Sequence, residues 1–314
     1  MTAIAILNSV NLLGKELRET IEARHPEWAD IRLLSTREDE IGTLTEIQGA
    51  AALVGRYETG SLEGVDIAFF CGPMEANRPI LAELPAETIA IVLSFDATLE
   101  DGLPVVSGVN TSTAYGGRVL ISPHPGVVLI SHLLHPLRDF SPEEAVATLI
   151  QPASTQDEAG IEELFETTRQ IVAMTKRTPT PVFGTQLAFN ILPSQLPVDP
   201  IASQLGAVLT GLPPVALQIL QGGVFHSVSA SLYVRCAADP SPMTVRKALA
   251  ASPMVEAAGK PRLLGPVEAA ASDKVIFSTV RRDEGRGGFW LWAAMDNLTR
   301  GGALNAVEIA EAVS

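Results

Sequence analysis

The sequence predicts an α/β protein in two parts: a parallel sheet covered on both faces, followed by a mostly antiparallel sheet with helices on one face. In the first third, short apolar runs alternate with segments of helical periodicity; the runs are 4–7, 31–34, 66–71, 89–93 and 119–121. Apolar runs this short, separated by helices, are typical of parallel strands that are buried on both faces. The later part differs: a strand-like run at 146–150 precedes a helix, and further runs at 215–220 and 228–234 follow, an arrangement that favours a mostly antiparallel sheet with helices on one face.

Two further features complete the expected elements. The runs 275–280 and 289–294 flank a polar, glycine-rich stretch, which predicts a hairpin. Helical periodicity is present over 161–172, and the chain ends on a predicted helix over 302–313. With 314 residues the chain is long enough for two hydrophobic cores, so we expect two domains.

Composition and charge exclude several classes of function. The formal charge is −14, and no run rich in Lys or Arg is present, so phosphate backbones and anionic lipid would be repelled. No apolar run approaches the ~20 residues of a membrane-spanning helix, and no basic region precedes the first apolar stretch as in a signal peptide. Cys71 and Cys236 lie in apolar runs and are expected to be reduced core residues. We therefore expect a soluble, cytoplasmic protein with no nucleic-acid or membrane partner.

Three segments resemble the aspartate-semialdehyde dehydrogenase family. Residues 296–311, DNLTRGGALNAVEIAE, resemble its DNLRKGAALNAVQIAE signature, and 188–193 resemble its AFN-x-(I/L)-P segment. Residues 151–164 are similar to the stretch from its YQ-x-x-SGAG motif into an E-E-L helix. The resemblance implies a Rossmann-like nucleotide-binding domain, residues 1–125 completed by the C-terminal helix segment 296–314. It also implies an α+β dimerisation domain, residues 126–295, that holds the substrate site and forms a homodimer.

The catalytic motif of the family is changed in this sequence. Active members reduce an acyl phosphate with NADPH through a cysteine thioester in a PNCST-x-Q motif, and a downstream histidine relays the proton. The matching stretch starts at Ser122 and places Pro125 at the cysteine and Leu129 at the glutamine, while alignment to the NPGCYPT pattern of acetylglutamyl-phosphate reductases places Val127 at the cysteine. Neither proline nor valine can form a thioester. His226 falls at the family's histidine, but as a base without a nucleophile it is interpreted as vestigial.

Other anchoring groups of the family are also missing. The segment that reads E-E-x-K in the family is 200–205 here and contains no charge, so an acyl phosphate or a substrate carboxylate would be held weakly. Cys71 is the alternative nucleophile, but its strand runs to the nucleotide side of the sheet, and a buried small core residue is the favoured interpretation.

The nucleotide-binding motif keeps few of its glycines. The family's loop G-A-T-G-x-V-G becomes residues 8–14, in which only the last glycine survives. Side chains would crowd the approach of a phosphate, although Asn tolerates positive φ. Ser35-Thr36-Arg37 resembles the element that grips the 2′-phosphate of NADP, but Glu38 and Asp39 would oppose a phosphate. The sequence therefore predicts no bound cofactor, with NADP as the alternative, and its candidate nucleotide-binding residues are Asn8, Ser9, Asn11, Gly14, Ser35, Arg37 and Asn297.

Histidines and paired carboxylates offer two further candidate sites. His132 and His135 form an H-x-x-H pair close to His124. Because no third ligand follows at a defined spacing, we expect helix-end histidines that contact solvent or backbone, and no metal site. The pairs 143–144, 162–163 and 283–284 are interpreted as a solvated surface.

These observations support three hypotheses about function. The first is a non-catalytic member of the family that acts as a binding or regulatory scaffold, as a homodimer that binds a partner protein or a small ligand. The second is an NAD(P)-dependent oxidoreductase that acts on an aldehyde or an acyl-phosphate-type substrate with altered chemistry and uses His226 as acid or base. The third is a regulator that forms a heteromeric complex with an active relative.

Overall fold

The chain forms two compact units in the computed structural model, which describes residues 2–28, 30–175, 179–259 and 263–314. One unit comprises Met1–Pro125 with Gly301–Ser314, and the other comprises Gly126–Arg300. Residues 296–300 were expected in the first domain but belong to the second unit. The reason is that Asp296 and Asn297 accept hydrogen bonds from backbone N–H groups of the second unit, those of Ala271 and Ser227.

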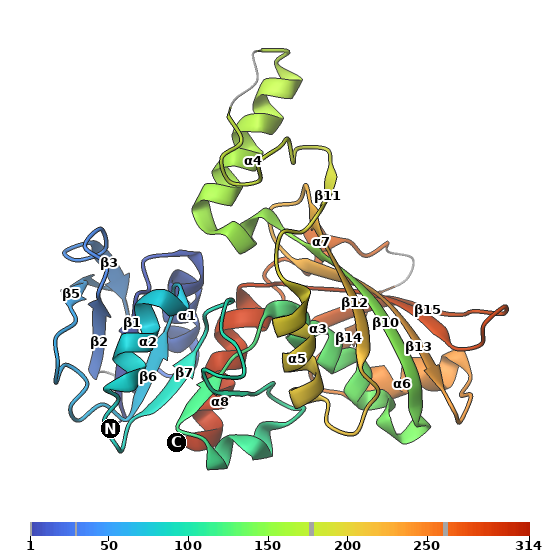
Figure 1. Cartoon of the computed structure of the whole chain (residues 1–314), viewed down its shortest axis with the longest axis horizontal. Helices are drawn as coiled ribbons and strands as arrows, with labels where there is room; N and C mark the ends of the chain where they lie inside the picture. Colours follow the sequence, from blue (N-terminus) through green and yellow to red (C-terminus); the bar gives the residue numbers. More distant parts are fainter. Residues whose placement is uncertain (1, 29, 176–178, 260–262) are drawn as a thin grey trace. The chain divides into compact units, whose positions relative to one another are not determined.

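The first unit is built on a parallel sheet (Figure 1). Its described residues contain seven strands in the order β5-β2-β1-β6-β7-β9-β8, and each neighbouring pair is parallel. The bounds are β1 Ala3–Leu7, β2 Asp30–Ser35, β5 Gly55–Arg56, β6 Ile67–Phe70, β7 Ile89–Val92, β8 Leu103–Pro104 and β9 Val119–Ile121. A separate hairpin, β3 Leu44–Ile47 and β4 Ala50–Leu53, follows β2. The five predicted strands are all present.

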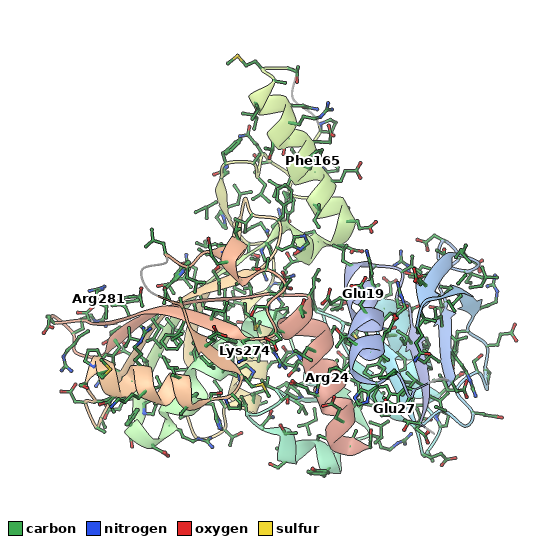
Figure 2. All side chains as sticks on the ribbon, turned by 180° about the vertical axis from the view of Figure 1, so that it is seen from behind. Glu19, Arg24, Glu27, Phe165, Lys274 and Arg281 are labelled. Atoms are coloured by element: carbon green, nitrogen blue, oxygen red, sulfur yellow. The ribbon has the colours of Figure 1, made fainter. Side chains whose placement is uncertain are left out.

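Three helices pack on this sheet: α1 (Leu12–Arg24), α2 (Met74–Ala82) and α8 (Leu304–Val313), and a 3₁₀ helix η1 spans Thr111–Gly116. Met74 and Ile80 of α2 join the core formed by alternate residues of β1, β6 and β7. The last helix pairs with the first, because Arg24 donates two hydrogen bonds to Glu311, 2.8 and 2.9 Å long. Figure 2 labels Arg24 near the end of α1. The chain's C-terminus is thus part of the first core.

The second unit contains a mixed sheet. Among its described residues, seven strands run in the order β11-β12-β10-β13-β16-β15-β14, with four antiparallel neighbours and two parallel ones, β10–β12 and β14–β15. The expected hairpin is present as β15 and β16. The bounds are β10 Pro142–Gln151, β11 Ile191–Pro193, β12 Val215–Gly222, β13 Val228–Cys236, β14 Val255–Ala257, β15 Val275–Arg282 and β16 Phe289–Met295.

One face of this sheet forms the second core. Alternate strand residues such as Leu149, Leu232 and Leu291 are almost completely buried. Helix α4 extends away from the sheet (Figure 1) and packs through Leu164 against Phe183 and Leu187. The remaining helices are α3 Pro125–Leu134, α4 Asp157–Val172, α5 Val198–Val208, α6 Pro242–Ala251, α7 Pro266–Ala269, the 3₁₀ helices η2 His135–Phe140 and η3 Ala153–Gln156, and a π-helical turn η4 Thr299–Ala303.

Within the part of the chain that the structure describes, we find no helix with the length and apolar character needed to cross a bilayer.

Candidate functional site

The turn between β1 and α1 occupies the position of a nucleotide-binding loop. The strand order reverses at β1 and β6, and open α/β sheets bind ligands at the carboxyl ends of the strands at such a point. Asn8, the first residue after β1, adopts a left-handed conformation with φ of 51°. Gly72 lies so close across this point that a Cβ there would be 3.1 Å from the Asn8 backbone oxygen. The carboxyl ends of β1 and β6 are therefore in close contact through Asn8.

The side chain of Asn8 is the centre of a buried hydrogen-bond network. Its Oδ1 accepts from the Thr36 backbone N–H at 3.0 Å and lies 2.9 Å from the Ser35 hydroxyl. Its Nδ2 donates to Asn77 Oδ1 at 2.7 Å, and Asn77 Nδ2 reaches the Cys71 carbonyl and the Ser94 hydroxyl at 2.8 and 2.9 Å. The network joins the ends of β1, β2, β6 and β7. A phosphate would have to displace these bonds before it could approach the backbone here.

The other residues of the turn also form intramolecular contacts. Asn11 caps α1, because its Oδ1 accepts from the Gly14 N–H at 2.7 Å. The Ser9 carbonyl accepts from Arg18 Nη1 at 2.9 Å, and burial lowers the pKa of Arg18. Gly14 has a packing role, since a Cβ at this position would lie 2.1 Å from the Ser9 carbonyl oxygen. The surviving glycine is therefore explained by the close approach of helix and turn.

The element expected to hold a 2′-phosphate carries paired charges. Arg37 forms ion pairs of 2.9 Å with both Asp39 and Glu40. Glu40 is almost completely buried and lies 2.8 Å from the Ser35 hydroxyl, a role that the sequence analysis missed. Glu38 turns elsewhere and pairs with Arg56, which lowers the pKa of that carboxyl. The carboxylates of Asp39 and Glu40, which pair with Arg37, would repel an added phosphate.

The residues that the sequence resemblance aligns with the family's nucleophile motif lie at the start of α3. Pro125 is its first residue, and the Val127 and Leu129 side chains are fully buried. Both cysteines are buried, and burial raises the pKa of Cys71 to about 12 and that of Cys236 to about 11. Neither thiol is ionised near neutral pH, which agrees with the interpretation of Cys71 as a core residue.

His226 lies in the turn between β12 and β13 and is partly buried. The next residue, Ser227, has a φ of 72° and donates its N–H to Asn297 Oδ1 at 2.9 Å. Asn297 is fully buried and also exchanges hydrogen bonds with the Ser154 hydroxyl. Asn297 therefore stabilises the turn that carries His226. The Asn297 side-chain oxygen is used in this contact, because it accepts the Ser227 N–H.

The histidine pair differs from the expectation. His132 is buried, and its pKa is lowered to about 3 by burial and, secondarily, by the charges of Arg300 and His135. Its Nε2 has no hydrogen-bond partner, so the expected contact with solvent or backbone is wrong for this nitrogen. His124, which packs edge-on against Phe95 with ring centroids 5.8 Å apart, has its pKa lowered to about 4 by burial. No group of three His, Cys, Asp or Glu side chains within the described ranges is arranged to hold a metal.

One of the paired carboxylates is likewise not at the surface. Glu163 is buried and accepts from the Val182 and Phe183 N–H groups at 2.7 and 3.3 Å. The expected solvated surface is wrong for this residue, because the helix needs Glu163 to bind the following loop. Glu143 and Glu144 are partly exposed and pair with Arg235.

Comparison with known proteins agrees with this architecture, although no family model matches the chain. Curated relatives include the aspartate-semialdehyde dehydrogenases of Rickettsia bellii and Bacillus subtilis, 24% and 23% identical, with 98% and 99% of this chain and 96% of each relative covered. A USG-1 protein homolog of Azotobacter vinelandii is 26% identical over 98% of this chain and 96% of its own.

In sequence the chain is similar to aspartate-semialdehyde dehydrogenases over nearly its whole length. Solved structures share its fold. A probable aspartate-semialdehyde dehydrogenase from Pseudomonas aeruginosa superimposes with a TM-score of 0.92 at 23% identity over 99% of this chain and 97% of its own. Aspartate semialdehyde dehydrogenase II from Vibrio cholerae, solved with ASA, gives 0.89 at 24% identity over 100% and 98%.

The aspartate-semialdehyde dehydrogenase signature at the C-terminus consists of structural residues here. Asp296 accepts from the Leu298 and Thr299 N–H groups at 2.9 and 3.0 Å. Asn305 accepts from the Ser107 N–H at 2.9 Å and donates to the Val105 carbonyl and the Ser122 hydroxyl. Together with Asn297, these side chains satisfy buried backbone groups, so this segment stabilises the fold of the chain.

We predict that Asn8→Ala lowers the free energy of unfolding by about 3 kcal/mol, because three buried groups lose their partner. Asn8→Gly should cost about 1 kcal/mol less than Asn8→Ala, since glycine adopts the left-handed conformation without strain. Urea unfolding measures both. Asn11→Ala, which removes only a helix cap, is the control at about 1 kcal/mol. Equal costs for Asn8→Ala and Asn11→Ala would contradict the central role of Asn8.

We also predict that His132 makes the fold sensitive to acid. Its folded-state pKa of about 3 is below the ordinary value of 6.5, so the unfolded chain binds more protons between these values. The stability contributed by neutral His132 is complete above about pH 6.5 and is lost as the pH falls. Between pH 7.5 and pH 5, wild type should lose about 2 kcal/mol more than His132→Gln in urea unfolding.

The control for this measurement is Ser131→Ala, which changes the neighbouring buried position without a titrating group. It should keep the wild-type pH dependence. If His132→Gln also keeps that dependence, His132 is protonated in the folded protein or accessible to water, and the prediction is wrong.

Proposed function

We propose that the chain is a non-catalytic member of its family that acts as a homodimeric binding scaffold. The observation that carries the proposal is that Pro125 occupies the position of the nucleophile while both cysteines are buried thiols of raised pKa. Thioester chemistry needs an accessible thiolate, and this chain does not provide one at that position. Free, buried cysteines also support a cytoplasmic location.

The nucleotide site supports the same proposal. The Asn8 network fills the carboxyl ends of β1 and β6, and Arg37 is compensated by two carboxylates. Binding of NADP would break several buried hydrogen bonds and bring its phosphate beside Asp39 and Glu40. The cost of these changes is the reason we propose that the first unit serves the fold and not a cofactor.

We predict no saturable stabilisation by NADPH, NADP, NADH or NAD, because a ligand that binds the native state must raise its apparent stability. Thermal shift and calorimetric titration of the purified protein measure this. We also expect no reduction or oxidation of a semialdehyde or acyl-phosphate substrate by wild type, and none by Pro125→Cys, since the cofactor site is altered independently.

Circular dichroism establishes that Pro125→Cys is folded. Turnover by Pro125→Cys would mean that the substrate and cofactor sites are intact, and turnover by wild type would favour an oxidoreductase with altered chemistry in which His226 is the first residue to test. Either result would overturn the scaffold proposal.

We propose that the homodimer forms through the face of the mixed sheet that lies opposite its core. Strand register aligns Ala216, Val146, Tyr233 and Trp290 in one row across β12, β10, β13 and β16. Two adjacent rows contain Gln218, Thr148, Ser231 and Trp292, and Leu220, Ile150, Ser229 and Ala294. The three rows contain no charge, although the chain as a whole carries −14.

The surroundings of this face also suit a protein partner. Val146, near its centre, is 36% exposed, and a hollow of about 620 Å³ at one end is lined by Ile150, Ser229 and Trp292 together with neighbouring loops. Uncharged, partly exposed surfaces that contain aromatic side chains are typical of protein interfaces. A two-fold arrangement places the same face of two copies together, which is the commonest form of soluble oligomer.

We predict that wild type has a mass twice 33.2 kDa in light scattering after gel filtration. Val146→Glu should give a monomer at micromolar concentration, because it places a charge in the centre of the interface. Ala86→Glu, at an exposed position of the first unit, adds the same charge elsewhere and should remain dimeric. A monomeric wild type, or a dimeric Val146→Glu, would exclude this interface.

A further inference from the structure

A hollow of about 470 Å³ lies beside the last turns of α4, away from the positions that the family uses for chemistry. It is formed by Thr167, Gln170, Ile171, Met174 and Thr175 on the helix side and by loop residues including Gln186. Figure 2 shows α4, on which Phe165 is labelled. The loop is fixed on the helix by Glu163, which binds the N–H groups of Val182 and Phe183. The volume is within the range of about 300–1,000 Å³ of small-molecule sites.

The polar groups in this hollow include both acceptors and donors. Thr167 donates its hydroxyl proton to the Glu163 carbonyl at 2.7 Å, and Gln186 Nε2 donates to the Ala188 carbonyl at 3.0 Å. These two bonds stay within the protein, while the Thr167 lone pairs and Gln186 Oε1 remain as acceptors and the Gln170 side-chain amide also carries N–H donors. Gln170 Oε1 is buried and has no hydrogen-bond partner. A buried acceptor without a partner costs about 1–3 kcal/mol, and a donor from a ligand would remove that cost.

Charge narrows the class of ligand. None of the described residues that line the hollow is charged. A cation or an anion would lose its hydration without an opposite charge in contact among these residues. Ile171 and Met174 provide apolar surface beside Gln170. We propose that this hollow binds a small neutral molecule that donates N–H or O–H groups to Gln170 and packs an apolar part against Ile171 and Met174, with a primary amide as the best fit. This site is independent of the proposed loss of catalysis.

Three probes of one shape test the ligand class: benzamide, which is neutral and donates; benzamidine, which donates but is cationic; and benzoate, which is anionic and only accepts. The readout is the NMR spectrum of protein with ¹³C-labelled methionine methyl groups, six in the chain, with Met174→Leu assigning the resonance of Met174. Benzamide should shift the Met174 resonance saturably, with a lower dissociation constant than benzamidine, and benzoate should give no saturable shift.

Variants test the role of Gln170. Gln170→Leu removes the acceptor at similar size and should weaken benzamide binding about tenfold, which corresponds to one hydrogen bond that is no longer made. Thr168→Val changes the adjacent helix position, whose hydroxyl bonds to the Leu164 carbonyl, and should leave the affinity unchanged. Both variants are first shown to be folded by their methyl spectra.

The proposal is overturned if benzamide does not shift Met174 saturably, if all six methionines respond alike, or if benzoate or benzamidine binds at least as tightly. Unchanged affinity in Gln170→Leu would also overturn it. These results do not depend on the nucleotide and turnover measurements, so the failure of either proposal can be recognised separately.

Discussion

Buried backbone groups must find hydrogen-bond partners, and in this protein the segment 296–305 supplies many of them. Asp296 caps the turn that follows β16, Asn297 holds the turn before β13, and Asn305 joins α8 to the segment after β8. An unpaired buried donor is costly, so these side chains cannot be exchanged freely. This requirement explains why the family's signature is present in a chain whose catalytic motif is changed. These side chains serve the fold itself, whatever chemistry the chain performs.

A second set of polar contacts organises the carboxyl edge of the parallel sheet. In a nucleotide-binding domain this edge leaves backbone N–H groups available to phosphate. Here amide side chains form hydrogen bonds within the protein at this edge. Asn8 and Asn77 connect four strands, and Asn11 caps the first helix. The parallel sheet therefore keeps its fold while side-chain hydrogen bonds occupy its carboxyl edge.

Local sequence patterns were sufficient for much of the fold. The longer strands of both sheets were predicted because short apolar runs mark buried strands, and the mixed sheet was predicted as mostly antiparallel. The short strands β5, β8, β11 and β14 were missed, because two or three residues give no recognisable pattern. The hairpin β3–β4 was missed, since its side chains are largely exposed and have no apolar period. Asn77 and Glu40 were missed as partners of the candidate site, because their roles depend on contacts with residues distant in space. Glu163 was expected at the surface for the same reason, because its burial depends on the loop whose N–H groups it binds.

The network around Asn8 also determines what single substitutions in this turn can achieve. Substituting Asn8 by glycine alone would leave Ser35, Thr36 and Asn77 without their shared partner, while the charges beside Arg37 would still oppose a phosphate. Each step toward a phosphate loop would therefore lower stability before it produced any affinity. These contacts are coupled, so a single substitution in this turn would lose hydrogen bonds without creating a site for phosphate.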